Sequence, residues 1–318
     1  MRQYIIRRLL MTIVVVFAAA ILIFSIMYFV PGDPVKIMLG PDATQEQILA
    51  QRTKLGLEDP FIVQLGKFLY NVFLKFDLGS SWVRGTPVVD AMGERLPRTL
   101  LIGLLSVVFS SVAAIPLGIS SAIHHDKWQD RAISVGSMAC FSIPDFWLAL
   151  MLVLLFSLKL NLLPSFGIGT PAHYVLPIVA ASIHGIGTIV RQMRSSMLEV
   201  IRSDFVTTAR AKGVKERSVI YRHMLPNALI PVVTTIGQSV ARCVAGVIII
   251  EQIFSIPGIG MYLTNAITAR DYPIVRGCTI VFAIFTAILM LAVDLVYGVI
   301  DPRIKAQYIG MSKRRTKR

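Results

Sequence analysis

Six long apolar blocks, almost free of charged side chains, constrain this chain more than any other feature of its sequence. A run of about 18 or more apolar residues is long enough to cross the hydrocarbon core of a bilayer as a helix. The fourth block is the weakest, because Pro177, His184, Gly185 and Gly187 interrupt it. These blocks predict an all-α membrane protein with six transmembrane helices in a lipid bilayer. They cover approximately residues 9–30, 100–122, 134–158, 174–190, 228–250 and 277–300.

The positions of the basic residues predict how the six helices are oriented. A formal net charge of +14 would suggest nucleic-acid binding in a soluble protein. With the amino terminus inside, however, the segments assigned to the cytoplasm hold 20 Lys or Arg, and the two short external loops hold 3. Basic residues near membrane spans are retained in the cytoplasm. The pattern therefore predicts that both termini are cytoplasmic, and the basicity requires no nucleic acid.

The blocks also divide the chain into regions. Residues 1–30 form an N-terminal span, whose apolar stretch is too long for a cleaved signal peptide. Residues 31–98 form an external segment that carries 8 basic and 8 acidic residues, and its amphipathic stretches predict short helices around 45–55 and 60–74. This segment is either a docking or gating surface or a simple cap over the helix ends. Residues 99–300 form a five-span core, and residues 301–318 form a basic cytoplasmic tail.

The cytoplasmic segment before the fifth block predicts a rigid helical elbow over residues 203–226. Ser203 and Asp204 are good N-cap residues, and Gly213 suits the position just after a helix end. Arg210 and Lys212 place positive charge in the last turn of the intervening helix, where the helix dipole favours it. The alternative is a solvated basic loop. Side chains small enough to let another protein approach closely lie between the caps: Thr207, Thr208, Ala209 and Ala211.

The second half of the elbow predicts another short helix, at about 215–224. We expect it to end at Pro226, because proline disfavours a helical conformation in the residue before it. Asn227 is then placed to cap the fifth span.

The elbow resembles a loop found in the inner-membrane permease family of binding-protein-dependent ABC importers. That loop has the form EAA, three residues, Gly, nine residues, and then a hydrophobic position and Pro. Here Thr207-Thr208-Ala209 precedes Gly213 at that distance, and His223-Met224-Leu225-Pro226 follows it. The leading Glu of the family is Thr207 in this chain, so a role for that acid does not carry over. The form is similar to the dipeptide, oligopeptide and nickel branch.

Further motifs that resemble this branch occur in order along nearly the whole chain, and their order and spacing are more specific than any one of them. They are Tyr4-Ile5-Ile6-Arg7-Arg8-Leu9-Leu10, Val30-Pro31-Gly32-Asp33-Pro34, Asp77-Leu78-Gly79-Ser80-Ser81, Ser142-Ile143-Pro144-Asp145-Phe146, Arg194-Ser195-Ser196-Met197-Leu198-Glu199, Glu251-Gln252-Ile253-Phe254-Ser255-Ile256-Pro257-Gly258-Ile259-Gly260, Val293-Asp294-Leu295-Val296-Tyr297 and Asp301-Pro302-Arg303-Ile304.

The resemblance implies a permease subunit in a prokaryotic inner membrane, which forms half of a translocation pathway for peptides or related solutes. It implies four kinds of partner: a second permease subunit, more often a different chain than a copy, two cytoplasmic ATPases, and an extracytoplasmic solute-binding protein. ATP and Mg would be bound by the ATPases, and no cofactor is expected on this chain. The residues leave open whether the solute is a dipeptide, a longer peptide, a nickel chelate or a sugar. Carried over residue by residue, the coupling role falls on Thr208, Ala209, Arg210, Ala211, Gly213, His223 and Pro226.

Four residues inside the apolar blocks are candidates for a pathway, because charge inside a membrane is costly. Asp145 and Arg242 lie at similar depth, whereas Asp294 lies nearer the inner surface. We therefore expect Arg242 either to pair with Asp145 or to face the pathway and meet a substrate carboxylate. His184, beside Gly185, either lines the pathway or forms a hydrogen bond between helices.

Catalytic and metal-binding patterns are absent from the sequence. It contains no GxxxxGK[ST] phosphate loop, GxSxG elbow, HExxH helix or paired Cys motif, so we expect no enzyme and no metal site. His124, His125, Asp126 and Asp130 form a polar loop that is more simply solvated than metal-bound. The alternatives are an ion-gradient-driven secondary transporter, for which the halves show no repeat, a membrane enzyme, and an ABC exporter.

Overall fold

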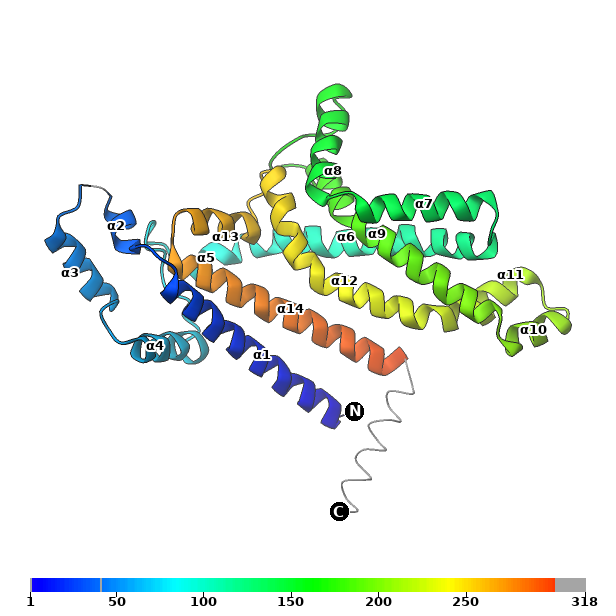
Figure 1. Cartoon of the computed structure of the whole chain (residues 1–318), viewed down its shortest axis with the longest axis horizontal. Helices are drawn as coiled ribbons and strands as arrows, with labels where there is room; N and C mark the ends of the chain where they lie inside the picture. The colour runs from blue at the N-terminus through cyan, green and yellow to red at the C-terminus, as the bar shows by residue number, and fades with distance from the viewer. Residues whose placement is uncertain (1, 41, 301–318) are drawn as a thin grey trace, which may run out of the picture. The chain divides into compact units, whose positions relative to one another are not determined.

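The computed structural model describes residues 2–40 and 42–300, and its regular structure is helical. Two compact units can be distinguished. Unit 1 contains residues Leu100–Ile256 together with residues 2–6 and 289–300, and unit 2 contains Arg7–Thr99 and Pro257–Ile288. The predicted tail 301–318 and the side chains of Asp294 and Cys243 lie outside the described part of the chain. Figure 1 labels the helices, which we describe unit by unit.

Unit 2 is built from several short helices and parts of two long ones. The predicted helices of the segment 31–98 are confirmed, and their ends follow local rules. Thr44 and Gln47 form a capping box at the start of α3, and Gly56 ends that helix in the left-handed conformation. The elements are α1 (Arg2–Phe29), α2 (Pro34–Leu39), α3 (Gln45–Leu55), α4 (Phe61–Leu74), α5 (Val88–Gly93), α13 (Ile259–Thr268) and α14 (Tyr272–Ile300).

Segment 31–98 shares one interior with the later part of the chain, so it is not a separate domain. Val88 and Met92 of α5 pack against Tyr262 of α13 and Cys278 of α14. Asp271, which is 1% exposed, fixes the loop before α5 by accepting hydrogen bonds from the Ser81 hydroxyl, the Trp82 amide and the Val83 amide at 2.5, 3.0 and 3.4 Å. A buried carboxylate that accepts several hydrogen bonds can hold a loop of this kind rigidly.

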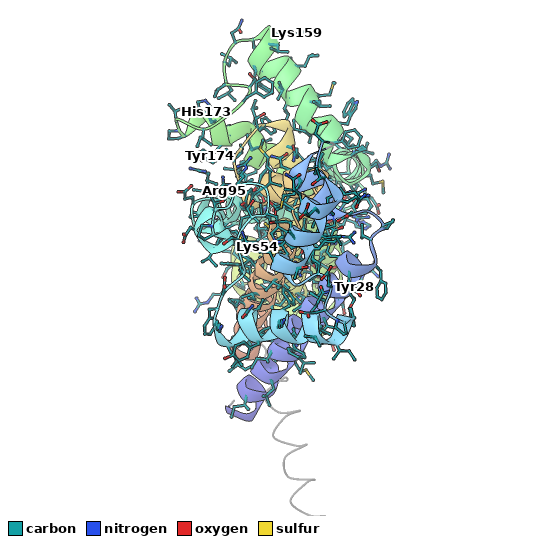
Figure 2. The ribbon with its side chains drawn as sticks, turned by 90° about the vertical axis from the view of Figure 1, so that its left-hand side faces the viewer. Tyr28, Lys54, Arg95, Lys159, His173 and Tyr174 are labelled. Carbon is teal, nitrogen blue, oxygen red and sulfur yellow. The ribbon has the colours of Figure 1, made fainter. Side chains whose placement is uncertain are left out.

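In unit 1, α9 runs between α7 and α12 and also packs on α8 (Figure 1). Gly187 lets α9 approach α7 closely, because a Cβ at this position would lie only 2.6 Å from the Ser137 carbonyl oxygen of α7. Lys159 lies at the tip of η1, and His173 and Tyr174 begin the next helix (Figure 2). The elements are α6 (Leu96–Ile123), α7 (Trp128–Ser142), α8 (Asp145–Leu152), η1 (Val153–Lys159), α9 (Ala172–Ile201), α10 (Asp204–Ala211), α11 (Glu216–Ser218), η2 (Val219–Met224) and α12 (Leu225–Ile253).

The predicted spans agree with the structure in part. In the described part of the chain, 4 helices are long and apolar enough to cross a membrane, or up to 5 if one bent pair counts as a span. The fourth predicted span, weakest in sequence, is one continuous helix within α9. The third, 134–158, was expected as a single span but is bent by 102° between α7 and α8. Ile143 is extended (φ −76°, ψ 126°) because Pro144 follows it.

Candidate functional site

The segment between α9 and α12, which the sequence predicts to be an elbow, begins with the helix α10 over Asp204–Ala211. Ser203 occupies the N-cap position of α10, but its hydroxyl does not accept the expected hydrogen bond from a backbone amide of that helix. It donates instead to the Val200 carbonyl at 2.6 Å, and so joins the turn to the end of α9. Within α10, the Thr208 hydroxyl donates to the Asp204 carbonyl at 2.8 Å. These two bonds tie the side chains of the turn to the backbone.

The end of α10 is fixed by Gly213. Its φ of +74° lies in the left-handed region that favours glycine. The Gly213 amide donates to the Arg210 carbonyl at 2.9 Å, and the Val214 amide donates to the Ala209 carbonyl at 3.3 Å. This pair of bonds is the Schellman arrangement, in which a hydrophobic residue after the glycine packs back on the helix. Val214 does so, because it packs against the core that contains Ala209.

One face of α10 is buried, and this corrects the role assigned to Ala209. Ala209 is 9% exposed and Val206 is fully buried, and both pack with Val219 and Met224 of η2. Ala209 therefore holds the elbow together and does not offer a contact to another protein. The other assigned residues of α10 are exposed. They are Thr208, Arg210 and Ala211, with Thr207 beside them.

Arg210 links the two halves of the elbow. Its guanidinium donates to both oxygens of Glu216, at 2.6 and 3.1 Å. The hydrogen bonds from Arg210 hold the pKa of the Glu216 carboxyl below its ordinary value, and Glu216 in turn raises the pKa of Arg210. Both side chains are exposed, so the pair orients the turn more than it stabilises the protein.

The second half of the elbow differs from the prediction. The helix expected over 215–224 is a short α-turn followed by the π-helix η2, which leads into α12 at Leu225 without a break. Pro226 lies in the first turn of α12, where the missing amide hydrogen costs little, so it does not end a helix. Asn227 does not cap that helix, because its side-chain amide donates to the His223 carbonyl at 2.8 Å. His223 is partly buried and Pro226 is exposed.

An ion pair joins α7 to α9, and no pattern in the sequence predicted it. Asp130 of α7 is 3% exposed and accepts two hydrogen bonds from the Arg194 guanidinium of α9, both at 2.7 Å. The hydroxyl of Ser121, from α6, donates to it at 2.5 Å. Arg194 is 64 residues away in sequence, so no local pattern could have paired the two. His125, Asp126 and Asp130 are close enough to suggest a metal site, but Arg194 and Ser121 already engage Asp130.

The predicted pathway residues are brought together only in part. Asp145 and Arg242 form no ion pair in the described part of the chain, which corrects the pairing inferred from depth, and Arg242 is exposed on α12. His184, not Arg242, interacts electrostatically with Asp145. The centroids of the His184 and Phe141 rings lie 4.7 Å apart, and the Arg191 guanidinium lies over the Phe141 ring, 4.4 Å from its centroid. Equal depth could not fix the pairing, because it says nothing of the direction in which a side chain points.

Family models and known relatives match nearly the whole chain. Residues 114–306 match the family described as binding-protein-dependent transport system inner membrane component, and residues 1–103 match the N-terminal part of the membrane component of such systems. A putative peptide transport system permease protein of Brucella abortus (strain 2308) is 37% identical over 313 residues, covering 96% of this chain and 99% of that protein. The oligopeptide transport system permease protein AppB of Bacillus subtilis (strain 168) is 37% identical over 316 residues, covering 96% and 100%.

Other relatives and solved structures extend the comparison. The glutathione transport system permease protein GsiC of Escherichia coli O6:H1 is 34% identical over 305 residues, covering 96% of this chain and 99% of that protein. Among solved structures, the inward-facing MetNI methionine ABC transporter has a TM-score of 0.57 at 18% identity, covering 66% of this chain and 96% of that chain. An amino acid ABC transporter has a TM-score of 0.54 at 12% identity, covering 66% and 94%. At these identities the structural likeness establishes the fold alone.

The long apolar helices and the likeness to solved ABC transporters define a multi-pass helical membrane protein of the ABC permease fold. More particularly, the chain belongs to the binding-protein-dependent transport system inner membrane components. Members of this family are non-catalytic permease components, and ATP hydrolysis lies in partner subunits.

Proposed function

We propose that this chain is the permease subunit of an ATP-driven importer of peptide-like solutes, and that the elbow 203–226 docks on a partner ATPase that binds Mg and ATP. The chain would supply half of the translocation pathway through six spans, with both termini in the cytoplasm of a prokaryotic cell. The other half would come from a second, different permease subunit, and an external solute-binding protein would deliver the solute. Segment 31–98 would lie on the external side, and 301–318 would form a cytoplasmic tail.

The observation that carries this proposal is the construction of α10. A helix of this length is unstable by itself in water. Here its inner face is buried through Val206 and Ala209, its end is closed by Gly213, and the Arg210–Glu216 pair braces it against α11. These restraints leave small and basic side chains on the outer face. A rigid helix with small side chains suits insertion into a groove of another protein, because little entropy is lost on docking.

We propose a peptide-like solute because relatives of this chain are described as permeases for peptides, oligopeptides and glutathione. These names support a peptide-like solute without selecting its length. The pathway is proposed to include Asp145, His184, Arg242 and Asp294, of which Asp145 and His184 interact.

Uptake in reconstituted vesicles tests the proposal. The chain would be assembled with its partner permease, its ATPases and its binding protein, and uptake of a labelled tripeptide would be followed with and without ATP. We expect uptake to require both ATP and the ATPases. Uptake that continues without the ATPases and collapses with the ion gradient would instead identify a secondary transporter, and would overturn the proposal.

A bulky substitution on α10 tests the role of the elbow. Ala211→Trp places a large side chain on the exposed face, and we expect it to abolish peptide-stimulated ATP hydrolysis while leaving the permease folded. Ala50→Trp, the same change at an exposed position of α3, is the matched control and should leave hydrolysis unchanged. Normal stimulation in the Ala211 variant would show that this face does not dock on the ATPase.

A further inference from the structure

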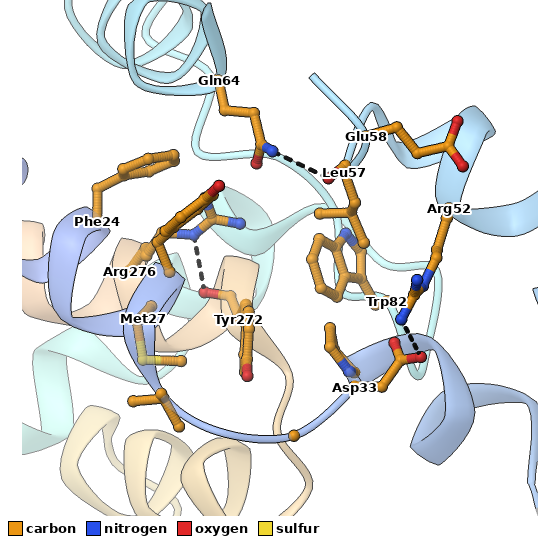
Figure 3. A pocket seen from close by; sticks show the side chains of 14 residues that line it. Phe24, Met27, Asp33, Arg52, Leu57, Glu58, Gln64, Trp82, Tyr272 and Arg276 are labelled. Carbon is orange, nitrogen blue, oxygen red and sulfur yellow. Dashed lines mark hydrogen bonds and ion pairs between the residues drawn. The ribbon is translucent and has the colours of Figure 1, made fainter. Parts of the chain in front are cut away.

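Unit 2 contains a cavity of about 440 Å³ that the transport function assigned above does not use. Its walls come from α1 and the segment after it, the end of α3 and the loop that follows, α4, the loop after α4 and the start of α14, as Figure 3 shows. A cavity of this size is within the range of small-molecule sites, about 300–1,000 Å³. Most of its wall is aromatic or apolar, with a few charged groups, which is the composition typical of a binding site for a small organic molecule.

Arg276 is the unusual residue of this cavity. Its guanidinium lies 5.3 Å from the ring centroids of both Phe24 and Phe68 and 5.8 Å from that of Trp82. Its Nε donates to the Tyr272 carbonyl at 3.3 Å (Figure 3). Within the described part of the chain, no other acceptor and no carboxylate is bonded to it. Its two terminal nitrogens therefore keep donors that the protein does not satisfy.

Two carboxylates of unit 2 that could have compensated Arg276 are engaged elsewhere. Asp33 pairs with Arg52 at 2.6 Å, and Asp271 accepts from Ser81 and from backbone amides. Arg276 is partly buried, and its guanidinium lies among aromatic rings without a carboxylate partner. Aromatic faces attract a cation but offer its N–H groups no strong acceptor. Planar, forked N–H donors of this kind match a carboxylate in two parallel hydrogen bonds. The unsatisfied donors of Arg276 therefore call for an anion from outside the chain.

The other side of the cavity favours a zwitterion over a simple anion. Glu58 lines it, and in the described structure only the Thr53 hydroxyl donates to that carboxylate, at 2.9 Å. Figure 3 places Glu58 and the Arg52–Asp33 pair across the cavity from Arg276, with the exposed Glu58 carboxylate at the rim and turned away from Arg276. An inorganic anion at Arg276 would gain nothing from Glu58, whereas a molecule with an ammonium group at its other end would be attracted to both ends of the cavity.

We infer that this cavity binds a short peptide, with its terminal carboxylate on the Arg276 guanidinium, its apolar body against Phe24 and Trp82, and its amino end toward Glu58. The inference rests on the proposed function, because it takes peptides as the solute class. It adds a binding site within unit 2, made of residues other than the four proposed for the pathway, where a solute is held on the permease itself.

Intrinsic fluorescence tests the inference in the full chain in lipid nanodiscs. The chain has 3 tryptophans. Replacing the exposed Trp128 and Trp147 by Phe leaves Trp82 as the only reporter in the cavity. Trialanine, trialanine with an amidated carboxyl end, and inorganic phosphate would be titrated in turn. We expect trialanine, followed by the Trp82 emission, to bind with a dissociation constant at least about tenfold lower than that of its amide. The amide lacks the carboxylate and so loses one charge-assisted contact.

Variants locate the contact. Arg276→Gln should weaken trialanine binding about tenfold or more and remove the preference over the amide, while Arg276→Lys should keep part of it. Arg84→Gln, at an exposed arginine outside the cavity, is the matched control and should bind as the parent does. The comparison of trialanine with its amide is made on the parent chain, so it stands even if a variant folds poorly.

Each other outcome overturns the inference. These outcomes are no binding of trialanine at millimolar concentration, equal binding of peptide and amide, equal or tighter binding of phosphate, and unchanged binding in Arg276→Gln. Uptake measurements separate this inference from the proposed function. ATP-dependent uptake without Trp82-reported binding would remove only the site, and binding with ATPase-independent uptake would remove only the proposed function.

Discussion

At the scale of single residues, the Asp130 carboxylate alone links three helices. It accepts both hydrogen bonds of the Arg194 fork and one from Ser121, and thereby connects α6, α7 and α9. Removing one partner of such a pair leaves the other charge without compensation, which costs more than the pair contributes as a whole.

Asp130→Asn should lower the free energy of unfolding by about 3 kcal/mol, the lower end of the range for buried pairs, because Arg194 is 30% exposed. Thermal unfolding in detergent, followed by size-exclusion chromatography, measures this loss. Asp126→Asn is the control, since that side chain is 82% exposed and asparagine tolerates its positive φ. Equal stability of the two variants would contradict the role given to Asp130.

Gly187 carries a second residue-scale prediction, because it sets the separation of α7 and α9. A Cβ there would lie 2.6 Å from the Ser137 carbonyl oxygen and 3.1 Å from the Phe141 amide nitrogen, and backbone atoms cannot move aside cheaply. Gly187→Ala should therefore destabilise the protein by about 1–3 kcal/mol. Gly136→Ala, in α7 with nothing within 4 Å of the added carbon, should be neutral or slightly stabilising. Thermal unfolding of the two variants distinguishes these effects, and an equally stable Gly187 variant would contradict the close packing.

At the scale of elements, the elbow depends on several weak restraints acting on one short helix. The exposed Arg210–Glu216 pair is worth at most about 1 kcal/mol, and the buried face of α10 contributes through Val206 and Ala209. Since the pKa of Glu216 is held below its ordinary value, the pair contributes fully above that value. Its contribution falls only as the pH drops through the lowered pKa, well below neutral.

Hydrogen exchange of the α10 amides tests this restraint. Arg210→Glu and Glu216→Arg should each lower protection by up to about fivefold, which corresponds to about 1 kcal/mol, and the double swap should restore most of it. After correction for the intrinsic rate, protection should be the same at pH 6 and pH 8. A marked loss of protection between these values, or no rescue in the swap, would contradict the assignment of this pair.

At the scale of the whole molecule, the membrane orientation that we predict from the charge distribution is open to direct measurement. In a background without native cysteines, Glu46→Cys on α3 and Lys212→Cys after α10 place single thiols at exposed positions. We expect a membrane-impermeant maleimide to label the first only from outside the cell and the second only from the cytoplasm. Labelling of both from one side would contradict the six-span arrangement.

The sequence alone determined the features that depend on neighbours in the chain. Apolar runs specified long helices, and Gly213 specified the end of α10, because a left-handed residue after a helix is a local requirement. The amphipathic stretches of segment 31–98 likewise specified α3 and α4. In each case, interactions among residues a few positions apart select the local structure, so the sequence pattern predicts that structure directly.

Only the tertiary structure decided which distant side chains meet. It paired Asp130 with Arg194, placed the His184 ring against Phe141, buried Ala209 and surrounded Arg276 with aromatic rings. These outcomes depend on how each helix is rotated about its axis and on which helices pack together. The long apolar blocks carry little information on either, because a helix that is apolar all round can turn any face to its neighbours.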